Sequence, residues 1–234
     1  MRINKRFLIA FLFIMMIFNS SASYSEGNYS EITGDKKIIQ VLDSFNKTSM
    51  DKKTLEAIMG SNLSKKPVKI MFADLMQFSA HNEDYDALTC MDSSERLYIL
   101  IDNKHKDAPV EALMSILSHE VIHQDKVSSK AEELQGWLNE VLEWIALKKL
   151  NPELENIPEN KYPLVDRLNT IEKMYINAGY SSKEIYTQIC SNPVYTDLPL
   201  YSPGFNNIVD DTYISSIMLS NNTLISHSFE AKKE

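Results

Sequence analysis

The spacing of hydrophobic residues along the chain predicts a series of helices. Between residues 36 and 46, apolar side chains recur at the intervals that place them on one face of a helix. The same kind of spacing, with glycine or proline near several of the ends, predicts further helices. These cover residues 51–59, 109–123, 129–150, 164–178 and 181–190.

Three segments between these helices have the pattern of β-strands. Residues 68–72 are β-branched and apolar, residues 87–91 form a short strand candidate, and residues 96–101 alternate as in a strand with one buried face. A polar turn and then the helix expected over 109–123 follow the last of them. We therefore expect an α+β fold in which a small mixed sheet packs on that helix and a mainly helical part follows.

The chain shows no internal repeat and no long linker, so we expect a single domain from residue 24 to residue 234. Residues 67–150 form its central part, with the sheet and two long helices that should pack antiparallel. Residues 160–234 are expected to hold helices and then loops with a short strand. Prolines 193, 199 and 203 break up the chain there.

Residues 1–23 have the features of an export signal. Arg2, Lys5 and Arg6 precede an unbroken apolar segment of 12 residues, Phe7 to Phe18, and small residues follow. The apolar segment is short for a membrane span, which needs about 20 residues. We therefore expect a secreted protein with no stable membrane span after cleavage. If the signal stays uncleaved, the protein would be held at the cell surface.

Composition and charge narrow the partners. The 234 residues are 44% hydrophobic and 24% charged, as in an ordinary globular protein. Removal of residues 1–23, which hold three basic residues and no acidic one, changes the formal net charge from −8 to −11. This acidity argues against nucleic acid or an anionic membrane as the main partner. The excess acidic residues are expected on the solvated surface. Cys90 and Cys190 fit either one disulfide or two free thiols.

A metal-binding motif lies in the helix expected over 109–123. Residues 119–123 read His-Glu-Val-Ile-His. Residues four apart are neighbours on one helix face, so His119 and His123 can bind the same metal ion. Glu120 then lies beside them, within reach of a water at that ion. Zinc suits neutral imidazole ligands and keeps an open position at catalytic sites, so Zn²⁺ is the expected cofactor. The other histidines, His81, His105 and His227, are isolated and expected to be solvated.

This segment carries a family resemblance. Residues Ser118 to Gln124, preceded by the strand-like Leu97 to Ile101, resemble the core of the zincin metallopeptidases. The resemblance covers about residues 67–150, and no specific family within the superfamily is identified. It implies that Leu97 to Ile101 is the edge strand that pairs with an extended peptide substrate. The metzincin pattern is excluded, because Lys126 and Ser129 stand where it requires glycine and histidine.

A glutamate of the following helix, as in gluzincins, is the better match for the third ligand. At 100° per residue, Glu132 and Glu143 point away from the apolar stripe of that helix, whereas Glu133 and Glu140 flank it. A short turn would bring Glu133 level with the two histidines within one residue. Glu140 would lie roughly 9 Å further along the helix. Helix geometry therefore favours Glu133.

A second resemblance favours Glu140 instead. Residues 137–140 read Trp-Leu-Asn-Glu, which is similar to the segment of gluzincin aminopeptidases whose glutamate binds zinc, and residues 136–140 also resemble the corresponding segment of thermolysin-like enzymes. Both glutamates therefore remain candidates. The one that does not bind the metal is expected to form a salt bridge or to orient a ligand histidine.

The expected function is zinc-dependent hydrolysis of peptide bonds, with Glu120 as general base. Four residues are candidates for the donor that stabilises the tetrahedral oxyanion: Tyr162, Tyr180, Tyr186 and His227. One alternative is a secreted, non-catalytic binding protein on a zincin-like scaffold. Another is a metal-dependent amidase that acts on a non-protein amide, because the motif does not distinguish hydrolysis of peptide bonds from hydrolysis of other amides. Substrate-binding residues and oligomeric state are not predicted.

Overall fold

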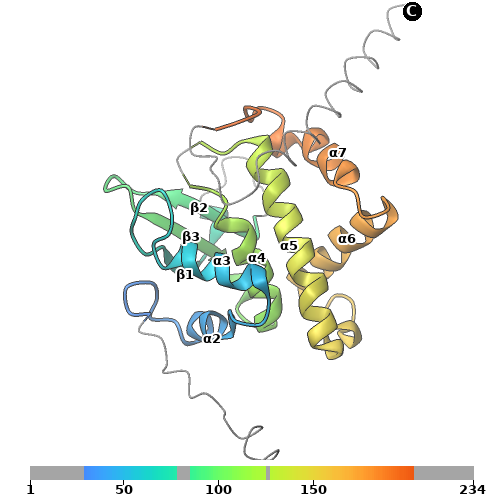
Figure 1. Ribbon diagram of the computed structural model, residues 1–234, viewed down its shortest axis with the longest axis horizontal. Helices are drawn as coiled ribbons and strands as arrows, with labels where there is room; N and C mark the ends of the chain where they lie inside the picture. The colour runs from blue at the N-terminus through green and yellow to red at the C-terminus, as the bar shows by residue number, and fades with distance from the viewer. Residues whose placement is uncertain (1–28, 78–84, 125–126, 203–234) are drawn as a thin grey trace, which may run out of the picture.

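The computed structural model describes residues 29–77, 85–124 and 127–202 (Figure 1). Within these ranges the chain is a mixed α+β structure with six α-helices and one three-stranded sheet, as expected. The export signal predicted over 1–23 lies outside the described residues, as do His81 and His227. So does most of the C-terminal segment for which a short strand was expected.

The predicted helices and strands are found within a few residues of their expected bounds. They are α2 (Lys36–Ser44), α3 (Ser49–Ile58), β1 (Lys69–Ala73), β2 (Ala87–Met91), β3 (Leu97–Asp102), α4 (Val110–Glu120), α5 (Lys130–Leu150), α6 (Pro163–Asn177) and α7 (Lys183–Ser191). Four short 3-10 helices connect them: η1 (Leu75–Gln77), η2 (Asn103–His105), η3 (Pro152–Asn156) and η4 (Pro193–Tyr195). Gly60 and Gly179, which end α3 and α6, both have positive φ angles, at which a side chain would be strained.

The order of the strands corrects one expectation. The sheet runs β1-β3-β2, with β3 parallel to β1 and antiparallel to β2. The prediction that Leu97 to Ile101 forms the edge strand is therefore wrong, because β3 has a partner on both sides. Its buried side chains, among them Leu97, Ile99 and Ile101, are typical of a central strand. In this order β2 lies at one edge of the sheet.

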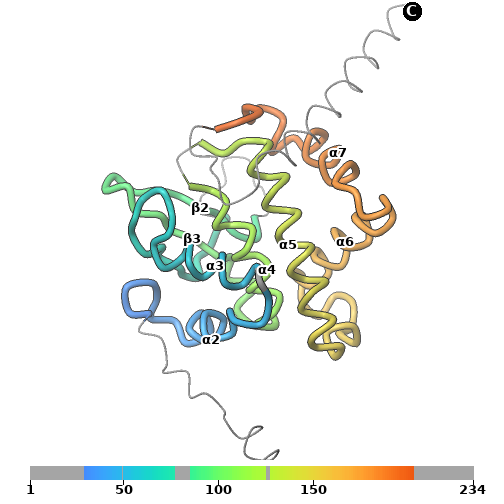
Figure 2. The backbone as a smooth tube through the Cα atoms, in the orientation of Figure 1, coloured from blue at the N-terminus to red at the C-terminus, as the bar shows by residue number. Residues whose placement is uncertain are grey.

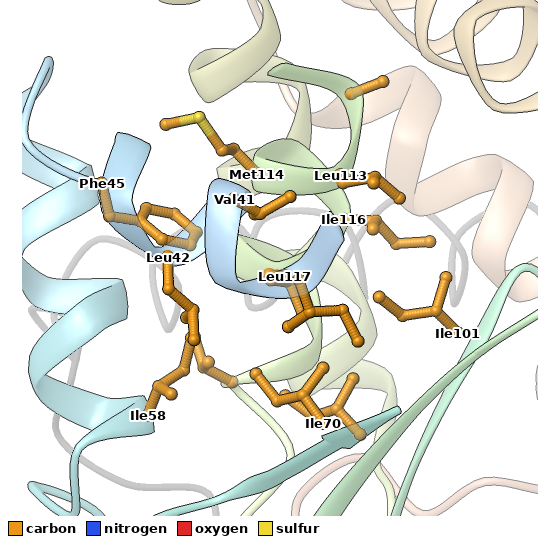
Figure 3. Packing of buried hydrophobic residues seen from close by; sticks show 14 of the residues in the cluster. Val41, Leu42, Phe45, Ile58, Ile70, Ile101, Leu113, Met114, Ile116 and Leu117 are labelled. Atoms are coloured by element: carbon orange, nitrogen blue, oxygen red, sulfur yellow. The ribbon is translucent and has the colours of Figure 1, made fainter. Parts of the chain in front are cut away.

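One core holds the sheet against helices α2, α3 and α4. Val41 and Leu42 of α2, Ile58 of α3 and Ile70 and Ile101 of the sheet belong to one cluster of buried side chains (Figure 3). α4 fills the space between them, and its side chains are buried from Ala112 to Glu120. Burial of apolar area on this scale is the main favourable contribution to folding. It fixes α4, which carries the metal-binding motif, on the sheet.

Helix α5 lies between this core and a second one. Figure 2 traces α4 and α5 as neighbours that run in opposite directions. On its other side, α5 packs against α6 and α7, where Leu134, Trp137 and Val141 meet Ile171 and Ile185. α5 is therefore covered on nearly all sides along most of its length.

Two glutamates of α5 outside the metal-binding candidates are exceptions to the expectation that the excess acidic residues lie on the surface. Glu132 and Glu143, which point away from the apolar stripe, are both buried. Ser129, the N-cap of α5, donates a hydrogen bond to Glu132 at 2.9 Å. Thr48 donates one to Glu143 at 3.0 Å, close to the buried Asp51 of α3. The apolar stripe of α5 predicted one buried face, whereas α3, α6 and α7 also cover other faces of this helix.

The state of the cysteines and the character of the helices bear on two further expectations. Cys90 and Cys190 are free thiols, each partly exposed. Among the helices of the described ranges, none combines the length and apolar character required to cross a membrane.

The buried pair of Asp51 and Glu143 predicts a pH dependence of stability. Burial, and after it the neighbouring Asp51, raise the pKa of Glu143 to about 8. The folded protein therefore keeps a proton that the unfolded chain releases above about pH 4.5, so stability falls as pH rises towards 8. We expect Glu143→Gln to flatten this dependence and to stabilise the fold at pH 9, as measured by urea unfolding between pH 5 and pH 9. The exposed Glu159, changed to Gln, serves as control. An equal decline with pH in wild type and Glu143→Gln would contradict this account.

Candidate metal centre

The last turn of α4 and the residues after it carry the motif. His119 and Glu120 belong to the helix, which ends at Glu120. The chain then tightens into i→i+3 hydrogen bonds, from Ile122 N to His119 O at 3.0 Å and from His123 N to Glu120 O at 3.2 Å. His123 thus lies just beyond the regular helix, which is shorter than expected. The tight turn still keeps His123 beside His119, with ring centroids 5.5 Å apart.

Helix α5 brings Glu133 to both histidines. Nε2 of His119 lies 3.5 Å from Oε2 of Glu133, and Nε2 of His123 lies 3.6 Å from Oε1. One ligand atom from each of the three residues falls within 4.8 Å of the other two. Of the four glutamates considered from the sequence, Glu133 is the one that joins the histidines in a group able to hold a metal ion.

The donor set and its dimensions fit a small divalent cation. Two imidazole nitrogens and one carboxylate are a ligand set that zinc accepts. Tetrahedral ligands at zinc-to-nitrogen distances of about 2.0–2.1 Å lie roughly 3.3–3.4 Å from each other. The two separations of 3.5 and 3.6 Å in the structure are close to that value. The two histidines lie against different oxygens of Glu133, and one ligand atom from each residue lies within 4.8 Å of the others, so the three side chains would draw closer to share one ion.

Gly136 makes room for the ring of His119. A Cβ atom at this position would lie 2.5 Å from Cδ2 and 2.7 Å from Nε2 of His119. These separations are well below van der Waals contact, so any side chain there would displace the ring. The helix backbone can approach α4 this closely because residue 136 is glycine.

Glu140 occupies the position expected for the glutamate that does not bind the metal. Its Oε2 lies 3.2 Å from Nδ1 of His119, on the opposite side of the ring from Nε2. Glu140 is fully buried and forms a two-pronged ion pair with Arg167. A carboxylate at Nδ1 fixes the ring orientation and leaves Nε2 free for a metal ion.

Ser128 links the other two residues of the group. Its hydroxyl donates a hydrogen bond to Oε1 of Glu133 at 3.0 Å and lies 3.4 Å from Nδ1 of His123. With a proton on Nδ1, His123 can donate to Ser128, which in turn donates to Glu133. This arrangement also directs Nε2 of His123 towards the centre of the group.

Glu120 is held by the edge strand. The Thr89 hydroxyl, on β2, lies 2.7 Å from Oε2 of Glu120 and 3.0 Å from its carbonyl oxygen. Glu120 is buried next to His119 but is not part of the metal-binding group. Its carboxylate therefore remains available for proton transfer.

The charges within the group are strongly coupled. Burial alone would lower the pKa of His119, but its hydrogen bonds with Glu133 and Glu140 raise it to about 10. For Glu133, the opposing effect of burial is outweighed by the charge of His123, and the pKa falls to about 2. Without metal, the proton of His119 balances the buried carboxylates beside it, and a metal ion at Nε2 would replace that proton when it binds.

These residues lie in a cleft of 960 Å³. Residues 85–91, which include all of β2, line it, together with side chains of α6, α7 and the segment around η4. That segment is fastened to the first turn of α5, because Pro199 and Leu200 accept backbone hydrogen bonds from Lys130 and Ala131 at 2.9 and 3.1 Å. The cleft is large enough to admit a short stretch of peptide.

Three tyrosines considered from the sequence lie outside the cleft, and one histidine expected at the surface is buried. Tyr162, Tyr180 and Tyr186 do not line the cleft, whereas Tyr195 of η4 does. Sequence reasoning missed Tyr195, because it follows Glu133 by 62 residues in a segment without periodic pattern. His105, expected to be solvated, is instead buried, and its Nε2 lies 2.6 Å from Oδ1 of Asp86.

The close approach at Gly136 predicts a variant that damages the metal site alone. In Gly136→Ala, the added methyl group should push the His119 ring away from Glu133 and lower zinc affinity by about tenfold or more. Gly34→Ala is the control, because a Cβ at Gly34 meets no atom within 4 Å. Zinc affinity is measured by competition with a chromogenic chelator, and folding by circular dichroism. Wild-type affinity in a folded Gly136→Ala protein would contradict this role.

Comparisons of the chain with protein-family models, with curated proteins and with solved structures found no match.

Proposed function

We propose that the protein is an exported zinc-dependent peptidase of the zincin type. The observation that carries the proposal is the convergence of His119, His123 and Glu133 beside Glu120 in a cleft bordered by a sheet edge. The N-terminal segment, with its basic start and apolar stretch, supports export.

The group of three ligands supports a catalytic metal site over a structural one. Structural zinc is usually held by four protein ligands, often cysteines, whereas a catalytic site keeps one position open. The group here has three side chains. A zinc ion at such a site supplies a Lewis acid that polarises the scissile carbonyl and makes water easier to deprotonate.

Glu120 is the general base in this proposal. Glu120 directly follows the ligand His119 in sequence, and the Thr89 hydroxyl donates a hydrogen bond to one of its carboxylate oxygens. Glu120 accepts the proton of the attacking water and delivers it to the leaving amine. The hydrogen bond from Thr89 restricts the rotamer of Glu120, so the carboxylate is positioned before substrate arrives.

The edge strand β2 is the binding place for the substrate backbone. β2 borders the cleft, and no described strand pairs with its outer side. An extended peptide can pair with such an edge through main-chain hydrogen bonds. The role that the zincin resemblance assigned to residues 97–101 thus passes to residues 87–91. A peptide can pair with the main chain of such a strand at several residues, which a non-protein amide cannot do, and this favours peptidase over amidase activity.

Tyr195 is the candidate donor to the oxyanion. It lines the cleft, as the residues of β2 do, and contacts Trp137 edge to face, with centroids 6.4 Å apart. Burial and the nearby charge of Glu133 raise its pKa, so the hydroxyl keeps its proton and can donate a hydrogen bond.

The role of Glu120 predicts a clean separation of metal binding from activity. Glu120→Gln should keep about one zinc ion per chain and lose peptide hydrolysis by about 10²–10⁴-fold, because the amide accepts no proton from water. Zinc is measured by metal analysis of the purified protein, and activity on a broad peptide library. Absence of zinc from folded wild type, or full activity in Glu120→Gln, would overturn the proposal. A zinc-containing wild type that cleaves no peptide would favour the binding protein or the amidase.

The role of Tyr195 predicts a loss in kcat and not in metal content. Tyr195→Phe removes only the hydroxyl and should lower kcat by about 10²–10³-fold with little change in KM. Tyr180→Phe, at an exposed tyrosine outside the cleft, is the matched control. If Tyr195→Phe leaves kcat unchanged, another group stabilises the oxyanion.

A further inference from the structure

Arg167 of α6 lines the cleft and joins a buried carboxylate of α5 to a carboxylate beside β2. Its Nη1 and Nη2 contact the two carboxylate oxygens of Glu140, the second at 2.9 Å, and its Nε lies 3.2 Å from Oδ2 of Asp86. The guanidinium also lies over the ring of Trp137, 5.6 Å from its centroid. One side chain thus bridges a carboxylate beside the metal-binding group and a carboxylate at the end of the edge strand.

At one end of this bridge, Glu140 depends on Arg167. Glu140 is fully buried. Among the residues that the structure describes, its other side-chain hydrogen-bond partner is Nδ1 of His119. A buried carboxylate without a cationic partner is strongly destabilised. The planar guanidinium satisfies both oxygens at once, which a lysine could not do. The position of Glu140 against His119 is therefore set by Arg167.

At the other end, Asp86 is fixed to the sheet. It immediately precedes β2, and its carbonyl accepts a hydrogen bond from Asp102 N at 2.9 Å. Its Oδ1 also contacts His105 Nε2 at 2.6 Å and Lys104 Nζ at 3.2 Å. Asp86 is thereby tied to the chain that follows β3 and gives Arg167 a fixed point of attachment.

From these contacts we infer that Arg167 is a positioning residue for the metal centre: it presses Glu140 against Nδ1 of His119 and anchors this pair to the edge of the cleft through Asp86. The inference rests on the proposed function for the identity of the metal, but not for the contacts themselves. It implies that His119 keeps its Nε2 directed at Glu133 because of a residue 48 positions away in sequence. It also links the strand that would receive substrate to a metal ligand.

Zinc affinity of Arg167 variants tests this role. Arg167→Gln should bind zinc about 10–100-fold more weakly than wild type, as measured by chelator competition. Arg167→Lys should fall between them, because its ammonium group can contact only one of the carboxylates well. Arg96→Gln is the matched control: Arg96 also holds two segments together, by donating to the carbonyl oxygens of Pro67 and Glu31, but neither partner belongs to the metal group. Its zinc affinity should be that of wild type.

A second measurement needs no metal. In metal-free wild type, ¹⁵N-edited NMR should show a slowly exchanging Nδ1 proton of His119, protected by its hydrogen bond to Glu140. The signal should disappear in Arg167→Gln and in Glu140→Gln. Wild-type zinc affinity together with a persistent Nδ1 signal in folded Arg167→Gln would overturn the inference; if that variant does not fold, the same outcomes in Arg167→Lys decide. A wild type that binds no zinc would refute the proposed function, while the Nδ1 signal would still decide the role of Arg167.

Discussion

The close contact between α4 and α5 is the constraint on which the site depends. His119 and Glu120 come from one helix and Glu133 from the other, so the ligands meet only if the two backbones approach closely. Gly136 permits that approach at the level of the His119 ring. The apolar cores on both sides hold the pair of helices in place, since α4 packs on the sheet and α5 on α6 and α7.

Close packing of these helices buries several carboxylates of α5, which are stabilised by cationic partners or by a bound proton. Several carboxylates of α5 are buried, and each unpaired buried charge would destabilise the fold by several kcal/mol, on the order of 3–5. Glu140 is neutralised by Arg167, Glu133 lies against two histidines, and Glu143 keeps a proton. Glu133 differs from the others in that its partners are also good metal ligands. A divalent cation can therefore replace protons there without leaving a buried charge unpaired.

Much of this arrangement could be predicted from the sequence, where local patterns determine it. Helical periodicity predicted α4 and α5, and the antiparallel arrangement expected from the short turn placed Glu133 level with the histidines. Strand patterns do not determine which strands are neighbours; the expectation that β3 lies at the edge came from the zincin resemblance and is wrong. Arg167 and Tyr195 escaped prediction for a related reason: they come from α6 and η4, far along the chain, and only tertiary packing brings them to the cleft.

The central claim is that one zinc ion binds between His119, His123 and Glu133. Anomalous diffraction at the zinc edge, from crystals of the mature protein grown with zinc, tests it most directly. The account predicts a single strong peak within coordination distance of Nε2 of both histidines and of the Glu133 carboxylate, with Glu140 still at Nδ1 of His119. No peak at these residues, or a zinc ion bound by Glu140 in place of Glu133, would contradict it.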